Sequence, residues 1–238
     1  MSRSTGGAGN AMVVLLPGMD GSGLLFADFV EALGPDVDAK VVAYPPDRAL
    51  GYPELTVLAR AELPSDRPFV LLAESFSGPV AVALAALRPP GLRALVLVCS
   101  FVRSPISVPA VLWRLLAALP VERVPLWLAA AVLLGKFATP RLRGLLARAV
   151  AAVKPKVWRS RLAAVMSTDV ENLLSEIQVP LFYLRARQDR VVPRKASEVI
   201  LRALPQTRFV EFDSPHFMLQ AKPAESAAQI HRLLREIV

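Results

Sequence analysis

The sequence has a single cysteine, Cys99, among 238 residues, which excludes a disulfide framework and any zinc site built on cysteines. Long apolar runs are also missing: the longest, 124–134, has 11 residues, whereas a membrane-spanning helix needs about 20. Aromatic residues make up only 7%, and none of the usual DNA- or RNA-binding signatures occurs, so no nucleic-acid partner is expected. The first ten residues are polar and glycine-rich and hold no apolar signal-peptide segment. We therefore expect a disordered tail over residues 1–10 and a soluble, cytoplasmic protein.

The charge of the chain is unevenly distributed. Residues 101–165 contain eleven basic residues and one acidic residue, a net charge of +10, whereas the whole chain carries +8, so the remainder carries −2. The basic residues of this segment are Arg103, Arg114, Arg123, Lys136, Arg141, Arg143, Arg148, Lys154, Lys156, Arg159 and Arg161. A hydrophobic content of 54% excludes a disordered chain. The composition therefore indicates a globular body that carries one basic segment.

Short apolar runs alternate with stretches of helical periodicity along most of the chain. The predicted strands are 12–16, 40–44, 68–73, 93–99, 180–185 and 207–212, and the predicted helices are 24–33, 53–63, 78–87, 195–204 and 224–237. The strands lack the polar alternation of half-exposed antiparallel strands, which favours an α/β fold with a mostly parallel sheet of about six strands and helices on both faces. The alternation breaks once, at about 104–175, where a basic, Ala/Leu-rich segment interrupted by prolines predicts a helical cap inserted into one domain over 11–238.

Ser75 stands where the third predicted strand gives way to a helix, in the segment AESFSG. The functional groups of a parallel sheet collect at the carboxyl ends of its strands. A nucleophilic serine on such a sharp turn needs small residues two positions to either side, here Ala73 and Ser77, so the G-x-S-x-G pattern is present in relaxed form. Ser77 is the rival nucleophile, but it would place Pro79 where a small residue is needed. The alternative interpretation is an ordinary helix-capping serine.

An aspartate and a histidine follow the last two predicted strands. Asp189 lies in RQDRVVP after the fifth strand, and His216 lies in DSPH after the sixth. The other histidine of the sequence, His231, lies within a predicted polar helix, where a solvated position is expected. Ser75, Asp189 and His216 thus occur in the order nucleophile, acid and base, each at a different strand end. Asp213 lies close to the histidine in the sequence and is an alternative for the acid.

These residue types suit one chemistry. A serine hydroxyl is a poor nucleophile until a base takes its proton, and histidine titrates close to neutral pH. A buried aspartate orients the imidazole and stabilises the imidazolium that forms. The oxyanion of the tetrahedral intermediate needs two backbone N–H donors. We predict that Phe76, immediately after the nucleophile, supplies one, and that Met19, in the glycine-rich loop PGMDGSG after the first strand, supplies the other.

The segments LLPGMDGSG, LLAESFSG, RQDRVVP and DSPHF resemble the α/β-hydrolase superfamily over nearly the whole chain from Val13 onward. The oxyanion loop of that superfamily is usually H-G, and the P-G-M-D-G form found here is similar to its esterase, lipase and thioesterase branch. The resemblance implies the α/β-hydrolase fold and a serine hydrolase that cleaves carboxylic esters or acyl thioesters through an acyl-enzyme intermediate.

Other functions compete with this one. An acyltransferase would use the same site, and a non-catalytic binding module would keep only the fold. A dinucleotide-binding loop is disfavoured, because Gly18, Gly21 and Gly23 have the spacing G-x-x-G-x-G rather than G-x-G-x-x-G, and no acidic residue ends the second predicted strand. We therefore predict neither a cofactor nor a metal ion.

The predicted cap has two interpretations. Its basic residues either recruit an ester or thioester substrate with an anionic carrier or headgroup, namely acyl-carrier protein, CoA or an anionic membrane surface, or they keep the faces of an apolar insert solvated. Its apolar residues either line an acyl pocket or pack their own helices onto the core. The candidates for the pocket are Val108, Leu112, Leu116, Leu126, Trp127 and Leu133.

Overall fold

The computed structural model describes residues 11–105 and 124–237. The tail predicted at 1–10 lies outside these ranges, and so do residues 106–123 of the predicted cap.

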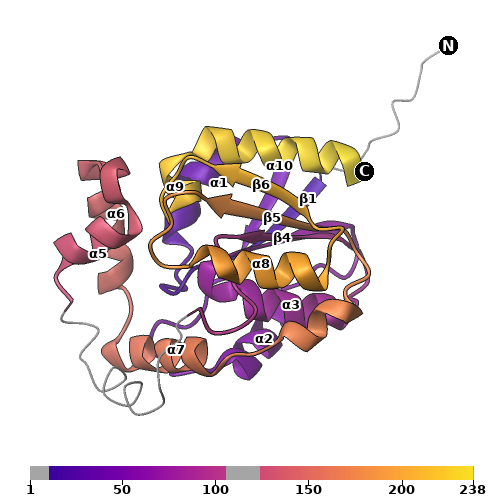
Figure 1. The fold of residues 1–238 in the computed structure, drawn as a ribbon, viewed down its shortest axis with the longest axis horizontal. Helices are drawn as coiled ribbons and strands as arrows, with labels where there is room; N and C mark the ends of the chain where they lie inside the picture. The colour runs from indigo at the N-terminus through magenta and orange to yellow at the C-terminus, as the bar shows by residue number, and fades with distance from the viewer. Residues whose placement is uncertain (1–10, 106–123, 238) are drawn as a thin grey trace.

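Six strands form one parallel sheet (Figure 1). The strands are β1 (Ala11–Leu16), β2 (Val37–Val41), β3 (Phe69–Glu74), β4 (Leu92–Val98), β5 (Leu181–Ala186) and β6 (Arg208–Phe212). They lie in the order β2-β1-β3-β4-β5-β6, and every neighbouring pair is parallel. The predicted α/β fold with a six-stranded parallel sheet is confirmed.

The second strand begins and ends earlier than predicted. It covers Val37–Val41 rather than 40–44. Val42 and Tyr44, which lie beyond its end, are each only 1% exposed, because the loop that they belong to is buried against the sheet. Apolar residues therefore mark a buried loop here as well as a strand, which is why the apolar run gave the wrong bounds.

Helices cover both faces of the sheet (Figure 1). One face carries η1 (Leu24–Phe26), α1 (Ala27–Leu33), α9 (Met218–Ala221) and α10 (Pro223–Ile237). The other carries α2 (Tyr52–Ala61), η2 (Ser75–Ser77), α3 (Gly78–Ala86) and α8 (Arg194–Ala203).

The residues of β1 show how the sheet divides the core. Val13 and Leu15 point into the cluster that contains α1 and α10, whereas Val14 and Leu16 point into the cluster that contains α2 and α3. All four are 0% exposed. Each fully buried aliphatic side chain stabilises the fold by about 1.5–3 kcal/mol relative to an exposed one. Burial on both faces fixes the strands, and thereby the loops at their carboxyl ends.

Between β4 and β5 the described residues are mostly helical. The elements are α5 (Leu126–Leu133), η4 (Gly135–Phe137), α6 (Pro140–Ala151), α7 (Pro155–Ser167) and η5 (Glu171–Glu176). Pro140 and Pro155 each occupy the first turn of a helix, where the missing N–H costs nothing. In Figure 1, α5 and α6 lie on the side toward which the arrows of β5 and β6 point. Among the described residues, no helix is both long and apolar enough to cross a membrane.

Candidate active site

Ser75 lies on the sharp turn between β3 and α3. Its φ of +49° falls in the left-handed region, which residues other than glycine rarely adopt. The hydroxyl of Ser100, just after β4, donates a hydrogen bond of 2.6 Å to the carbonyl of Ser75. A Cβ on Gly78 would lie 1.9 Å from that hydroxyl and 2.9 Å from the backbone oxygen of Phe101. Glycine at position 78 therefore lets α3 approach the end of β4 closely enough for the Ser100 hydroxyl to reach the Ser75 carbonyl and stabilise the turn.

Ser77, the rival nucleophile, is 0% exposed and does not line the pocket beside Ser75. Its hydroxyl donates to the carbonyl of Pro17, and the hydroxyl of Tyr44 donates to it at 2.8 Å. These bonds occupy the Ser77 hydroxyl and tie the turn to the loop after β1. Ser77 is therefore placed for packing rather than for attack on a substrate.

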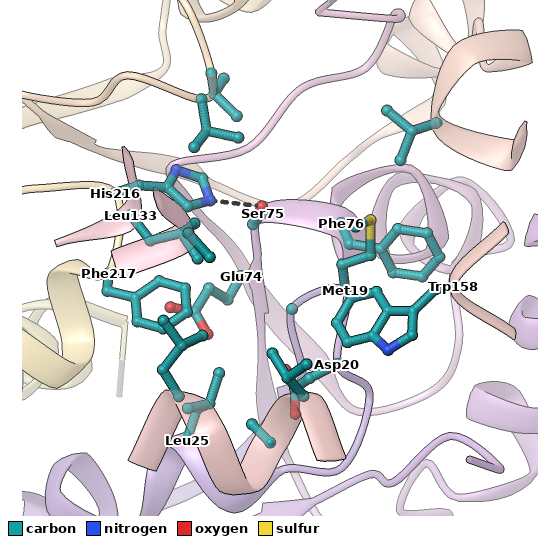
Figure 2. Close-up of a pocket in the computed structure, with 18 of the residues that line it drawn as sticks. Met19, Asp20, Leu25, Glu74, Ser75, Phe76, Leu133, Trp158, His216 and Phe217 are labelled. Atoms are coloured by element: carbon teal, nitrogen blue, oxygen red, sulfur yellow. Dashed lines mark hydrogen bonds between the residues drawn. The ribbon is translucent and has the colours of Figure 1, made fainter. Parts of the chain in front are cut away.

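His216 contacts Ser75 through one ring nitrogen (Figure 2) and Asp189 through the other. Its Nε2 is 2.9 Å from Ser75 Oγ, and its Nδ1 is 2.8 Å from Asp189 Oδ2. The other oxygen of Asp189 accepts hydrogen bonds of 2.8 Å from the backbone N–H groups of Val191 and Val192. The side chains of His216 and Asp189 are only 4% and 5% exposed. The structure thus brings together three side chains that the sequence placed at separate strand ends.

Asp213 takes no part in this arrangement. It is exposed, and its carboxylate accepts a hydrogen bond of 2.6 Å from the side-chain amide of Gln188. This hydrogen bond holds the pKa of Asp213 below its ordinary value. Of the two acids that the sequence left open, Asp189 is the one in contact with His216.

The predicted oxyanion donors, Met19 and Phe76, both line the pocket beside Ser75 (Figure 2). Phe76 is the middle residue of η2, which leads into α3. Met19 lies in the loop after β1, where the N–H of Gly21 donates to the carbonyl of Gly18 at 3.0 Å. This turn directs the backbone around Met19 toward the pocket. The donor role of the two N–H groups stays a prediction.

A pocket with a volume of about 290 Å³ lies beside Ser75, and its lining is mostly apolar. Two helices between β4 and β5, in the segment predicted as a cap, supply much of that lining: Leu146, Ala149 and Val150 from α6, and Trp158, Leu162 and Val165 from α7. The site therefore has room for an apolar group next to the serine hydroxyl.

The apolar cap residues expected at this pocket meet different outcomes. Leu126 and Leu133 line it. Trp127 is not among the residues that line it, and it is 71% exposed. Three candidates lie outside the described residues: Val108, Leu112 and Leu116.

Two buried acids at the pocket were missed from the sequence. Glu74 directly precedes Ser75, is 3% exposed, and accepts hydrogen bonds of 3.0 and 3.3 Å from the amide of Gln220. Burial raises the pKa of Glu74 to about 7. Burial also raises the pKa of Asp20, whose Oδ2 accepts a hydrogen bond of 3.0 Å from the N–H of Ser22. A glutamate at the end of an apolar run was the sequence signal for the first of these.

Cys99, Asp189 and His216 each place one possible metal-ligand atom within 4.8 Å of the others. Two of these atoms are already joined by the hydrogen bond between Asp189 and His216. Burial raises the pKa of the Cys99 thiol well above its ordinary range, which keeps the thiol protonated and a poor ligand. The cluster is therefore better suited to orienting the histidine than to holding a metal ion.

The order in which the sheet presents serine, aspartate and histidine at its strand ends is that of the α/β hydrolases. A comparison with protein-family models agrees, since the model of the α/β hydrolase family matches residues 13–229. The chain belongs to this family.

Solved structures share the fold at low sequence identity. A hydrolase from Oleispira antarctica is 12% identical with a TM-score of 0.81, and the alignment covers 96% of this chain and 92% of that one. An enol-lactonase from Burkholderia xenovorans is 18% identical with a TM-score of 0.79, covering 95% and 92%. A lipase-esterase related protein from Clostridium acetobutylicum is 14% identical with a TM-score of 0.77, covering 94% and 95%. No curated protein matches this chain.

Proposed function

We propose that this protein is a serine hydrolase that cleaves carboxylic esters or acyl thioesters by way of an acyl-Ser75 intermediate. The observation that carries the proposal is the hydrogen-bonded chain from Ser75 through His216 to Asp189 beside an apolar pocket. A hydroxyl held by a base next to apolar space suits attack on the carbonyl carbon of an acyl group whose chain lies in the pocket.

In the first half of the reaction, His216 Nε2 takes the proton of Ser75 as the serine oxygen bonds to the substrate carbonyl carbon. The N–H groups of Met19 and Phe76 stabilise the negative charge that develops on the carbonyl oxygen. Asp189 stabilises the protonated imidazole, and the two backbone hydrogen bonds to its other oxygen keep its carboxylate in place. The bond to the leaving group then breaks, and His216 passes its proton to the departing alcohol or thiol.

In the second half, a water molecule replaces the leaving group. His216 takes a proton from this water molecule while the water oxygen attacks the acyl carbon. The bond to Ser75 breaks, the proton returns to the serine oxygen, and a carboxylic acid leaves. If an alcohol took the place of water, the same steps would transfer the acyl group instead.

The nucleophile is tested by covalent labelling with a fluorophosphonate, read by the mass of the modified peptide. The wild-type protein should be labelled at Ser75 and should hydrolyse short apolar esters, and Ser75→Ala should lose both activities. Ser77→Ala is the matched control, because it removes the other serine of the same turn and should still be labelled. Labelling of Ser75→Ala, or an unlabelled wild-type protein, would refute the proposal. Added alcohol acceptors distinguish hydrolysis from transfer by the products formed.

We also propose that the basic cap attracts anionic acyl carriers. Three arginines of α6 support this because they are exposed: Arg141, Arg143 and Arg148. One of them, Arg141, also forms an ion pair with Asp28. Exposed charges are screened at distances beyond about 10 Å in 0.1 M salt, so the attraction must weaken as salt is added.

The test compares an acyl thioester on a carrier protein or CoA with a neutral short ester. Between about 20 mM and about 300 mM salt, kcat/KM should fall steeply for the anionic substrate and change little for the neutral one. Changing Arg143 and Arg148 to glutamate should lower kcat/KM for the anionic substrate and leave kcat/KM for the neutral ester unchanged. An equal salt response of both substrates would instead show that the charge only solvates the cap.

A further inference from the structure

Arg161 is charged, yet it is 1% exposed and is one of the largest fully buried side chains of the described residues. The sequence counted it with the solvent-facing basic residues of the cap, and this interpretation was wrong. Charged side chains are almost never fully buried unless they are paired. A side chain so enclosed cannot meet a carrier protein or a membrane, so its role lies inside the molecule.

The partners of Arg161 are backbone carbonyls of two loops. From helix α7, its Nη1 donates to the carbonyls of Met19 and Asp20, at 2.9 and 2.7 Å. Its Nη2 donates to the carbonyl of Pro45 in the loop after β2, at 3.1 Å. Burial lowers the pKa of Arg161, and the nearby charge of Asp20 opposes that effect. One guanidinium thus joins the cap to the loop that carries a predicted oxyanion donor.

The loop is shaped to admit this guanidinium. Gly21 has a φ of +65°, and a Cβ at that position would lie 2.6 Å from Nη1 of Arg161. The guanidinium carbon also lies 5.8 Å from the centre of the Tyr44 ring. A side chain at position 21 would push the guanidinium away from the carbonyls. The close approach therefore depends on glycine there.

These hydrogen bonds restrain the backbone on both sides of Met19. The carbonyl of Gly18, in the same peptide plane as the Met19 N–H, accepts from Gly21, and the carbonyl of Met19 accepts from Arg161. Holding both flanking peptide planes fixes the direction of the Met19 N–H. The side chain of Met19 also packs against the apolar cluster that contains Val157 and Trp158 of α7, and Figure 2 shows Met19 beside Trp158 from the pocket side.

We propose that Arg161 is a positioning residue of the hydrolase: it holds the loop after β1 so that the Met19 N–H points at the reacting carbonyl oxygen. The inference rests on the proposed function. Trp158, Leu162 and Val165 of the same helix line the pocket. Helix α7 therefore sets both the apolar wall of the pocket and the orientation of the oxyanion donor.

The experiment uses Arg161→Met, which keeps bulk but removes the donors, and Arg161→Lys, which keeps the charge but presents it as a single point. Arg60→Met, which removes an exposed arginine from α2, is the control. For each protein, kcat and KM are measured with a neutral short ester. The affinity for an alkylboronic acid is measured too, because the adduct with Ser75 mimics the tetrahedral intermediate.

Loss of one oxyanion donor typically lowers kcat by about 10²–10³-fold. Arg161→Met should therefore lower kcat and boronic-acid affinity together by about 10²-fold, with KM within about threefold of wild type. For Arg161→Lys, kcat and boronic-acid affinity should lie between those of Arg161→Met and wild type, since an ammonium group cannot match the forked donors of a guanidinium group. Arg60→Met should behave as wild type.

A merely structural role would lower the melting temperature while the folded protein kept its kcat and its boronic-acid affinity, and that result would overturn the proposal. If Arg161→Met fails to fold, the test rests on kcat and boronic-acid affinity of Arg161→Lys, each compared with wild type. Wild-type values of both in that variant would also overturn the proposal. The two proposals fail in different ways. If the wild-type protein is not labelled at Ser75, the proposed hydrolase function is refuted. If the wild type is labelled and active and the Arg161 variants are equally active, only the proposed role of Arg161 is refuted.

Discussion

Glu74 allows the electrostatics of the site to be tested through stability. It ends β3 directly before the nucleophile and is 3% exposed. Burial raises its pKa from 4.5 to about 7, against the lowering effects of the Gln220 amide and of His216, while Asp20 adds to the rise. The unfolded chain ionises Glu74 near its ordinary value, so the two states differ in bound protons between about pH 4.5 and 7.

The direction of the effect follows from proton binding. In this window the folded protein holds more protons on Glu74 than the unfolded chain does, so the free energy of unfolding falls as the pH rises. The contribution of Glu74 to the free energy of unfolding is fully present below its ordinary pKa of 4.5 and is lost by about pH 7. A difference of about 2.5 pKa units corresponds to about 3 kcal/mol.

Glu74→Gln should remove this loss. An amide stays neutral at every pH and accepts the same hydrogen bond from Gln220, and its own N–H can reach the Gln220 oxygen, which is buried without a partner among the described residues. The variant should match wild type at about pH 4 and exceed it by about 3 kcal/mol at pH 8.

The measurement is urea unfolding of wild type and variant at several pH values across this range. Glu31→Gln, the same substitution at an exposed position on α1, is the control for the exchange of a carboxylate for an amide. A difference between Glu74→Gln and wild type that stayed constant from pH 4 to pH 8 would show that Glu74 has the same pKa in the folded protein as in the unfolded chain, and would refute the reasoning.

Ser75→Ala should lower kcat by about 10⁴-fold or more in ester hydrolysis, and retention of over a tenth of the activity would remove it as nucleophile. Asp189→Asn should lower kcat by up to about 10⁴-fold because the histidine loses its orienting acceptor, whereas Asp213→Asn should have little effect; the reverse ranking in the same assay would exchange their roles. Gly78→Ala should destabilise the fold by about 1–3 kcal/mol in urea unfolding, because its new methyl would overlap the Ser100 hydroxyl. Gly144→Ala lies in α6, where none of the described residues beyond the helix's own backbone comes within 4 Å of the added carbon; it should stabilise the fold by up to about 1 kcal/mol, and equal effects of the two changes would refute the packing argument.

The sheet was largely predictable because strands buried on both faces read as uninterrupted apolar runs. The run 93–99 corresponds closely to β4 at Leu92–Val98. The bounds of β2 were not predictable, because Val42 and Tyr44 are apolar for the sake of a buried loop. Local composition reports burial, and only pairing with β1 distinguishes strand from loop.

The three residues at the strand ends could be placed together because parallel strands end at one edge of the sheet. Ser75, Asp189 and His216 needed only that rule, and their catalytic roles stay a prediction. Arg161 could not be singled out, because its own segment resembles that of the exposed Arg159 two positions earlier. What distinguishes Arg161 is a set of carbonyls from loops more than 100 positions away, which no local pattern records.

Because the strands are parallel, the recovery of activity during refolding should report when the long-range contacts of the sheet form. Ser75 leaves β3 in the interior of the sheet, whereas His216 follows β6 at its edge, 141 positions later. Parallel neighbours cannot pair through tight hairpins, so their contacts wait for long chain segments to close. Helical circular dichroism should therefore return before ester hydrolysis when the denatured protein is refolded. The interval between the two signals would measure how long the chain needs, once its helices have formed, to bring the segments of Ser75 and His216 together.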